Sequence, residues 1–266
     1  GIVTENRVPV RPSGTVFWES SPDGMSWSTL PCAPRSSLFS VATLFVQFGG
    51  RTEGSEPNPG QVRFSSLNGG NPAGVTWCPM SELSDDFDDG ELADQWAATY
   101  QQAGCTVSEV GGGIVMDFDG ASATDCVLIP ARPYDMRADG VSVEVQGVAQ
   151  GATSHYAYMR AEIDANNGFE FLYFGTELSA KVEVGGGANT IFSASYSPTQ
   201  HRWWRIREDV DTILWEVSAD GITWSSFASS ANPLDASALR PIVGAGMNSA
   251  EAGTFAFDNL NRAPGG

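Results

Sequence analysis

Part of this chain occurs twice. Residues 14–30 read GTVFWESSPDGMSWSTL and residues 211–227 read DTILWEVSADGITWSSF, and eight of the seventeen aligned positions are identical. A repeat of this kind means that one structural unit has been duplicated, so a fold that is predicted for one copy also applies to the other. The repeat therefore limits the possible folds more strongly than any single motif.

The similarity extends on both sides of this segment. Downstream, QVRFSSLN at 61–68 matches TFAFDNLN at 254–261, and upstream Asn6-Arg7 matches His201-Arg202. Three segments that match in the same order predict duplicated structure rather than chance similarity.

These matches predict an incomplete first domain. Residues 1–70 correspond to the last third of a domain whose complete copy spans 85–262, and 71–84, which contains glycine and two prolines, links them. Two interpretations remain open: tandem repetition of one stable domain, or a partial domain that another chain completes by strand donation or exchange.

The pattern within the complete copy indicates β-strands. Short runs rich in β-branched and aromatic residues are separated by Gly, Asn, Asp or Pro at intervals of roughly 8–12 residues. These runs lie at 141–148, 154–164, 168–174, 180–186, 190–197, 201–208, 212–218 and 254–260. Asp-Gly at 23–24 and 220–221 predicts hairpin turns, and only 91–103 has a weak helical pattern. The chain is therefore predicted to be all-β, an antiparallel β-sandwich or jelly roll with an N-terminal partial copy.

Four segments make the prediction more specific. WWRIRE at 203–208 and TILWEVSADGITW at 212–224, with DDFDDGELADQW at 85–96 and FAFDNL at 255–260, resemble the concanavalin A-like, laminin-G-like modules of bacterial extracellular repeat proteins. The resemblance implies that the first and last strands lie side by side. This fold contains lectins, glycosidases and purely structural modules, so it does not by itself define an activity.

Charge excludes several functions. With 14 basic and 32 acidic residues, the formal net charge is −18, which disfavours binding to nucleic acid and to anionic membranes. The chain has no apolar run near the roughly 20 residues that a membrane-spanning helix needs. Its two histidines cannot form a three-histidine zinc site, and no HExxH, G-x-S-x-G or P-loop motif is present.

The four cysteines have no C-x-x-C spacing. Cys105 and Cys126 flank a predicted pair of strands, so we expect a disulfide between them, which leaves Cys32 to pair with Cys78. Two disulfides in an acidic β-rich chain indicate an oxidising, extracellular compartment. Four buried free thiols are the alternative.

A glycosidase motif is started but not completed. Some glucanases of the resembled superfamily carry E-x-D-x-x-E on one strand, and here Glu162 and Asp164 begin that pattern. Asn166-Asn167-Gly168 then predicts a tight turn, and Glu170 falls beyond it. Without a paired carboxylate a retaining mechanism lacks its acid/base, so we expect no enzyme activity. A degenerate glycoside hydrolase remains an alternative.

Sugar contacts are predicted on one strand face. Alternation places Trp203, Arg205 and Arg207 on the same side, facing a ligand or a neighbouring domain, while Trp204 and Ile206 face the core. The recurring tryptophans of the repeat fit hairpin packing better than a ligand site. A second candidate, Tyr134, precedes a strand and is either a packing residue or a further sugar contact.

Calcium is the one cofactor that the sequence suggests. Asp86 and Asp88 would bind it together with Asp258, because hard oxygen ligands from adjacent first and last strands suit Ca²⁺. The alternative is a solvated run of charge around a buried Phe87.

Taken together, these patterns predict a non-enzymatic extracellular structural or adhesive repeat module. It would be a building block of a surface fibre, appendage or virion tail, with neighbouring copies or adjacent repeats as partners. A carbohydrate-binding module of a secreted protein, with cell-surface glycan as its ligand, is the second hypothesis.

Overall fold

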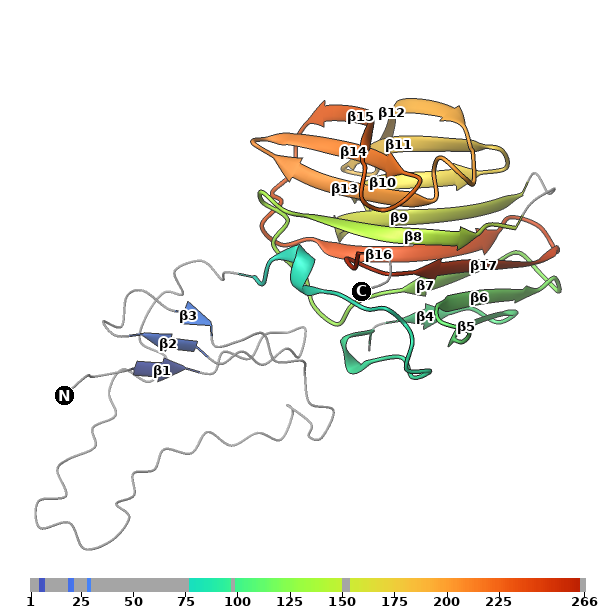
Figure 1. The fold of residues 1–266 in the computed structure, drawn as a ribbon, viewed down its shortest axis with the longest axis horizontal. Helices are drawn as coiled ribbons and strands as arrows, with labels where there is room; N and C mark the ends of the chain where they lie inside the picture. The colour runs from blue at the N-terminus through green and yellow to red at the C-terminus, as the bar shows by residue number, and fades with distance from the viewer. Residues whose placement is uncertain are drawn as a thin grey trace, which may run out of the picture. The chain divides into compact units, whose positions relative to one another are not determined.

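The protein consists of two compact units, Gly1–Val75 and Thr76–Gly266 (Figure 1). The computed structural model describes residues 5–7, 19–21, 28–29, 77–96, 99–149 and 154–263. Each unit is considered by itself below.

The second unit is built from fourteen strands. They are β4 (Tyr100–Gln101), β5 (Cys105–Glu109), β6 (Ile114–Asp119), β7 (Thr124–Leu128), β8 (Gly140–Gly147), β9 (His155–Asp164), β10 (Asn167–Phe174), β11 (Glu177–Val184), β12 (Gly187–Ser195), β13 (Trp203–Asp209), β14 (Thr212–Ser218), β15 (Ser225–Ala231), β16 (Arg240–Met247) and β17 (Ala252–Asp258). One-turn 3-10 helices, η2 (Met80–Glu82) and η3 (Asp94–Trp96), precede them. The described residues contain no α-helix, so the weak helical pattern at 91–103 yields only η3 and β4.

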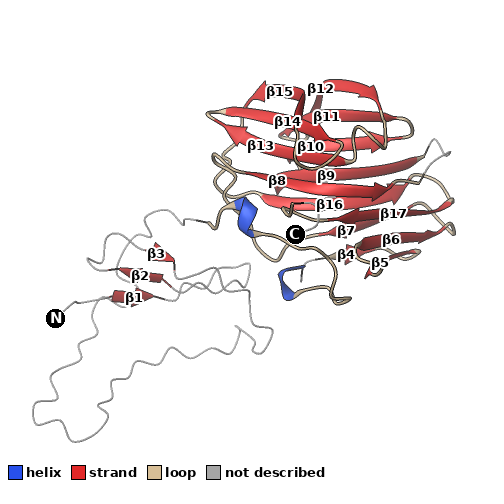
Figure 2. Cartoon of the chain, viewed as in Figure 1, coloured by secondary structure: helices blue, strands red, loops and turns tan. Residues whose placement is uncertain are grey.

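These strands form two seven-stranded antiparallel sheets (Figure 2). The first, called here the β9 sheet, has the order β12-β11-β10-β9-β16-β7-β4. The second, the β13 sheet, has the order β15-β14-β13-β8-β17-β6-β5. Both sheets run in the same general direction, as in aligned sandwich packing. The predicted jelly-roll β-sandwich is confirmed.

The core lies between the two sheets. Strand alternation sends Phe169 and Phe171 of β10 inward, and both are fully buried, as are Trp204 of β13 and Trp215 of β14. The Trp215 indole donates a hydrogen bond to the backbone oxygen of Glu170 on the opposite sheet, at 3.0 Å. Buried aromatic side chains of this size contribute most of the hydrophobic stabilisation of a sandwich core.

The edge strands β12 and β15 each contain a bulge. The register of β15 on β14 skips Phe227, and the register of β12 on β11 skips Ile191. Next to these bulges, the rings of Phe192 and Phe227 meet edge to face with centroids 5.1 Å apart. Bulges in edge strands re-aim side chains and also discourage pairing with other chains.

The first and last segments of the unit lie side by side, as the resemblance implied. The Asp85 amide donates to the Leu260 carbonyl at 3.0 Å, and the Trp96 indole donates to the Asp85 carboxylate at 2.7 Å. The described part of the expected linker also packs here, because Met80 and Leu83 are buried. The second unit therefore begins near Thr76, before the expected boundary at 85.

The first unit contains a three-stranded antiparallel sheet of β1 (Glu5–Arg7), β2 (Glu19–Ser21) and β3 (Ser28–Thr29). Its order matches β13-β14-β15. Glu19 pairs with Thr29 just as Glu216 pairs with Ser226, so the register follows the sequence repeat.

One alignment in the sequence analysis needs correction. Arg7 lies opposite Glu19 in the first unit, and Arg205 lies opposite Glu216 in the second unit. Since Glu19 corresponds to Glu216 in the repeat, the counterpart of Arg7 is Arg205 and not Arg202. The residues that correspond in the two strands are set by the ladder of backbone hydrogen bonds. An alignment of two residue types does not include this constraint.

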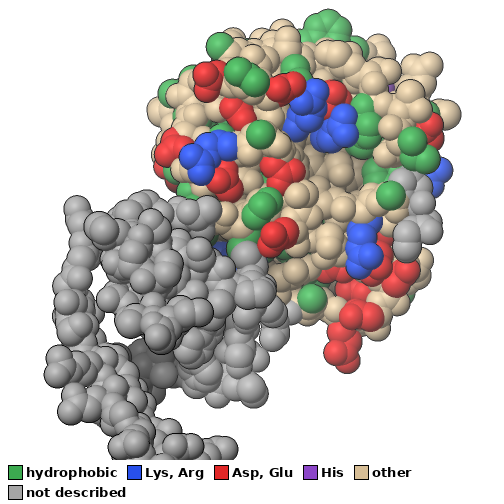
Figure 3. Space-filling model, turned by 60° about the vertical axis from the view of Figure 1, so that its left-hand side comes forward, with side chains coloured by type: hydrophobic (Ala, Val, Ile, Leu, Met, Phe, Trp, Pro, Cys, Tyr) green, Lys and Arg blue, Asp and Glu red, His purple; other side chains and the backbone are tan. Residues whose placement is uncertain are grey.

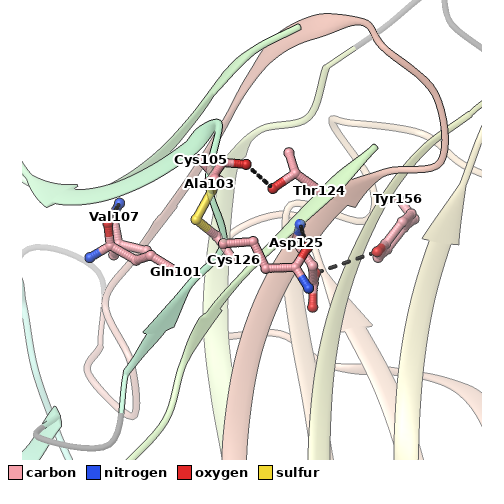
Figure 4. Close-up of a disulfide and its surroundings, with 9 residues drawn as sticks. Gln101, Ala103, Cys105, Val107, Thr124, Asp125, Cys126 and Tyr156 are labelled. Atoms are coloured by element: carbon pink, nitrogen blue, oxygen red, sulfur yellow. Dashed lines mark hydrogen bonds between the residues drawn. A yellow bond between two sulfur atoms is a disulfide. The ribbon is translucent and has the colours of Figure 1, made fainter. Parts of the chain in front are cut away.

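A disulfide joins the two sheets (Figure 4). Cys105 on β5 is bonded to Cys126 on β7, 21 residues later in the chain, as predicted. Thr124 donates a hydrogen bond to the Ala103 carbonyl beside it, at 3.0 Å. The other expected pairing falls on Cys32, which lies outside the described residues.

Removing this disulfide should destabilise the sandwich. A bond that closes a loop of about 20 residues contributes about 3 kcal/mol, mainly by restricting the unfolded chain. We expect a Cys105→Ala/Cys126→Ala variant to lose about that much free energy of unfolding in denaturant titrations under oxidising conditions. An unfolding midpoint equal to that of the wild type would contradict the structural role of this bond.

Candidate functional site

Two of the predicted sugar contacts are buried, which corrects that prediction. Trp203 and Tyr134 are each only 2% exposed. Trp203 does point to the outer face of the β13 sheet, but it lies between Glu144 and Ser218 on the neighbouring strands, and both are buried. Neither ring can offer a flat face to a sugar.

Tyr134 is a packing residue, one of the two alternatives that the sequence left open. Its backbone exchanges hydrogen bonds with Leu239 at 2.7 and 2.8 Å. Arg132 donates to its hydroxyl at 3.2 Å and lies over its ring.

The two predicted arginines hold the same face together. Arg205 and Arg207 both donate to the Glu216 carboxylate, at 2.8 and 2.9 Å. The Arg205 guanidinium also lies 4.1 Å from the centre of the Trp224 ring, a cation–π contact. Trp224 belongs to the β14–β15 loop, so this loop folds back over the outer face. The predicted site is thus a structural clamp whose charges are already paired.

The proposed calcium ligands lie near one another. The pKa of Asp258 is raised to about 6 by burial, and the carboxylates of Glu144, Asp88 and Asp86 add to the increase. However, Asp258 accepts from the Gln146 amide at 2.8 Å, and Asp86 pairs with Arg262 at 3.2 Å.

Within the described ranges, no group of three or more His, Cys, Asp or Glu side chains is arranged to hold a metal ion. Phe87 is 1% exposed, as the alternative of a buried phenylalanine within a charge run requires. Calcium binding stays a prediction.

The incomplete glycosidase motif lies on the outer face of the β9 sheet. Glu162 is 8% exposed and contacts Arg160 at 3.0 Å and Arg240 at 3.2 Å. Arg160 also donates to Glu183 at 2.7 Å, while the strand register places Glu170 opposite Arg160 on β9 and Lys181 on β11.

We call these six residues the charged ladder: Arg160, Glu162, Glu170, Lys181, Glu183 and Arg240. Burial raises the pKa of Glu162 and of Glu170, and the neighbouring cations counteract this. The ladder contains three acids and three bases on β16, β9, β10 and β11. Ion pairs join Glu162 to Arg160 and Arg240, and Glu183 to Arg160.

The other half of the same outer face is aromatic. Register places Tyr156 beside Phe174 and Tyr158 beside Leu172, and Tyr100 extends this zone at the far edge. Phe174 is 44% exposed and Tyr100 is 51% exposed. Exposed aromatic side chains that gather on one face indicate a binding surface.

Two glycines hold the central tyrosine rings on the sheet. Tyr158 lies opposite Gly244 and Tyr156 opposite Gly246 on β16. A Cβ at either glycine would overlap the ring that faces it, so each ring lies across the glycine backbone. The two rings are nearly parallel, with an interplanar angle of 18° and centroids 6.3 Å apart. We call Tyr156 and Tyr158 the tyrosine platform.

Sequence reasoning missed this platform, although a signal was present. YAYMRAE at 156–162 alternates in the same way as the predicted Trp203 strand, and PIVGAGM at 241–247 has two glycines at a spacing of two residues. The pairing of these two segments is not local, so neither pattern alone identifies the site.

On the face drawn in Figure 3, basic side chains lie next to acidic ones. In addition, the part of the chain that the structure describes has no helix long and apolar enough to span a bilayer.

The two sheets have the arrangement of a jelly-roll β-sandwich, which resembles that of concanavalin A-like modules. No protein-family model and no curated protein matches the chain. Several solved structures match it.

A laminarinase from Flavobacterium sp. UMI-01 matches with a TM-score of 0.49 and 8% identity, over 67% of this chain and 97% of that one. SCLam, a non-specific endo-β-1,3(4)-glucanase of family GH16, matches with a TM-score of 0.49 and 8% identity, over 71% and 97%. The potassium-bound carbohydrate recognition domain of Emp46p matches with a TM-score of 0.46 and 13% identity, over 69% and 97%. These likenesses concern the fold alone.

The charged ladder should depend on Arg160. An Arg160→Met variant leaves Glu162 and Glu183 without their shared guanidinium, and breaking a buried pair in this way costs about 3 kcal/mol. We expect that loss in urea unfolding at neutral pH, with a smaller loss in acid, where both carboxylates are protonated. Arg240→Met, at a more exposed position, is the control and should cost less. Equal losses at neutral and acid pH would contradict the ion-pair explanation.

Proposed function

We propose that this chain is a non-catalytic carbohydrate-binding sandwich of a secreted adhesive protein, and that the tyrosine platform is its ligand site. The observation that carries the proposal is the seating of Tyr156 and Tyr158 on Gly244 and Gly246. No other outer-face aromatic pair among the described residues is held in this way.

The chemistry of sugars suits such a surface. One face of a pyranose ring presents C–H groups, which are attracted to the electron-rich face of an aromatic ring. Both rings are already held by the sheet, so a ligand would lose little affinity to ordering them. Exposed Phe174 and Tyr100 widen the surface, and polar ladder residues lie at its border.

The carboxylates nearby support binding rather than hydrolysis. Glycoside hydrolysis generally needs two carboxyl groups, one that acts as the acid and another that acts as the nucleophile or base. Here Glu162 contacts two guanidinium groups and Glu170 lies between two cations. The Cys105–Cys126 disulfide supports secretion, since such bonds persist in oxidising compartments.

Removing either ring should weaken binding. We expect Tyr156→Ala and Tyr158→Ala each to weaken retention on immobilised polysaccharides by about tenfold, the effect of losing about 1.4 kcal/mol. An array of plant, algal and microbial polysaccharides identifies the ligand, and affinity electrophoresis measures the change.

A glycine pair tests the geometry itself. Gly246→Ala would push the Tyr156 ring off the sheet and weaken binding, whereas Gly147→Ala on β8 adds a methyl whose nearest neighbour is 4.0 Å away. The second variant should bind as the wild type does. An array without any ligand, or equal binding by both variants, would sink the proposed function.

A structural repeat is the second candidate function. The shared register of β2–β3 and β14–β15 supports repetition of one unit along the chain. Such a module would assemble with neighbouring copies or adjacent repeats.

Assembly gives this candidate its own test. We expect sedimentation velocity to show larger species as concentration rises, because an assembling module is held by contacts between copies. Electron microscopy of the same samples should then show regularly spaced units. A sedimentation coefficient that stays constant over a wide concentration range would argue against it.

A further inference from the structure

Two buried or half-buried carboxylates of the outer faces have no arginine or lysine partner among the described residues. One is Asp258 on β17, which accepts hydrogen bonds from the Gln146 and Asn259 amides at 2.8 and 2.9 Å, and the other is Asp125 on β7. Glu144, Glu162 and Glu216 each contact an arginine. Within the described ranges, no lysine or arginine pairs with Asp125. A carboxylate shielded from water without a cation is costly to keep ionised, so its presence calls for a physical reason.

The groups around Asp125 are neutral. From β9, the Tyr156 hydroxyl donates to it at 3.4 Å (Figure 4), and Tyr158 also faces it. Its partner on β16 is Gly246, and on the β4 side the Gln102 amide oxygen accepts from the Asp125 backbone. The two tyrosines are therefore the titratable side chains that face it.

This environment changes its acidity. Burial raises the pKa of Asp125 to about 6, and the hydroxyls of Tyr156 and Tyr158 and the Cys126 amide lower it only in part. Burial, with Asp125 beside it, likewise raises the pKa of Tyr156 to about 12, so this phenol stays protonated and available as a donor.

The carboxylate keeps unused hydrogen-bonding capacity. A separation of 3.4 Å is long for a hydroxyl donor, which prefers about 2.7 Å. Asp125 lies where the Tyr156 hydroxyl ends, at the border of the tyrosine platform, so hydroxyls of a stacked sugar would reach it directly.

We infer that Asp125 is a sugar-binding residue: its carboxylate accepts hydrogen bonds from hydroxyls of a carbohydrate stacked on Tyr156 and Tyr158, and its protonation weakens that binding. The inference rests on the proposed function. Hydrogen bonds to an ionised acceptor are roughly twice as strong as neutral ones, so losing the charge should reduce affinity by about tenfold.

Stability should change in the opposite direction. A carboxyl group whose folded pKa lies above its unfolded value destabilises the fold when it is ionised, and this cost disappears as pH falls through 6 toward 4. A purely structural Asp125 would show the reverse, because replacing it would remove a stabilising contact. Binding and stability together therefore distinguish the two roles.

The test compares Asp125→Asn with Glu177→Gln, which removes one charge from the same outer face beside Phe174. The polysaccharide array is read near pH 7 and near pH 5, and thermal unfolding is measured at both. We expect wild-type binding to weaken about tenfold on acidification. Asp125→Asn should bind about tenfold more weakly at pH 7, lose most of the pH dependence and unfold at no lower temperature than the wild type. Glu177→Gln should behave as the wild type.

The possible failures are distinguishable. Binding that Tyr156→Ala weakens but Asp125→Asn leaves unchanged would overturn this inference and keep the proposed function. A variant Asp125→Asn that retains the wild-type pH dependence would also overturn it. An array without any ligand for the wild-type protein would overturn both.

Discussion

The register between β9 and β16 is the constraint on which both faces of the β9 sheet depend. It places Tyr156 and Tyr158 opposite Gly246 and Gly244 on the outside, and it sends Ala157 and Met159 into the core. Because side chains alternate, a slip of one residue would bury the hydroxyls and expose the core side chains. The glycines reinforce the register, since any other residue opposite either tyrosine would collide with its ring.

The sequence allowed the fold and the Cys105–Cys126 bond to be predicted, because both follow from local patterns: alternation, turn residues and cysteine spacing. The proposed ligand site could not be predicted in this way. Alternation correctly placed Trp203 on the outer face of its strand, but it carries no information about what covers that face. The β14–β15 loop covers part of that face, since Trp224 lies against Arg205. The alternation of residues along a strand does not predict where a loop folds. The tyrosine platform was missed for the same reason, since its glycines come from a strand far away in the sequence.

Charge follows a consistent rule on the described outer faces. The arginines of these faces are occupied by carboxylates within the sheets, as at Glu216 and Glu162. Because these arginines are paired and the net charge is −18, the outer faces offer little positive charge to an acidic partner. Asp125 departs from this rule, because tyrosine hydroxyls face it where Glu144, Glu162 and Glu216 have guanidinium groups.

The repeated segments and the tyrosine platform lie in different sheets of the second unit. The repeated segments correspond to β13, β14, β15 and β17, and all four belong to the β13 sheet. The strands that build the platform, β7 and β9 with the facing β16, belong to the other sheet. The duplicated strands therefore belong to the structural framework, and contacts among Arg205, Glu216 and Trp224 stabilise it. The same residue types recur in the first copy at Arg7, Glu19 and Trp27. The YAYMRAE strand occurs once in the sequence. On the proposed function, a repeat protein of this kind could vary its binding face without changing the strands that the sequence repeat covers.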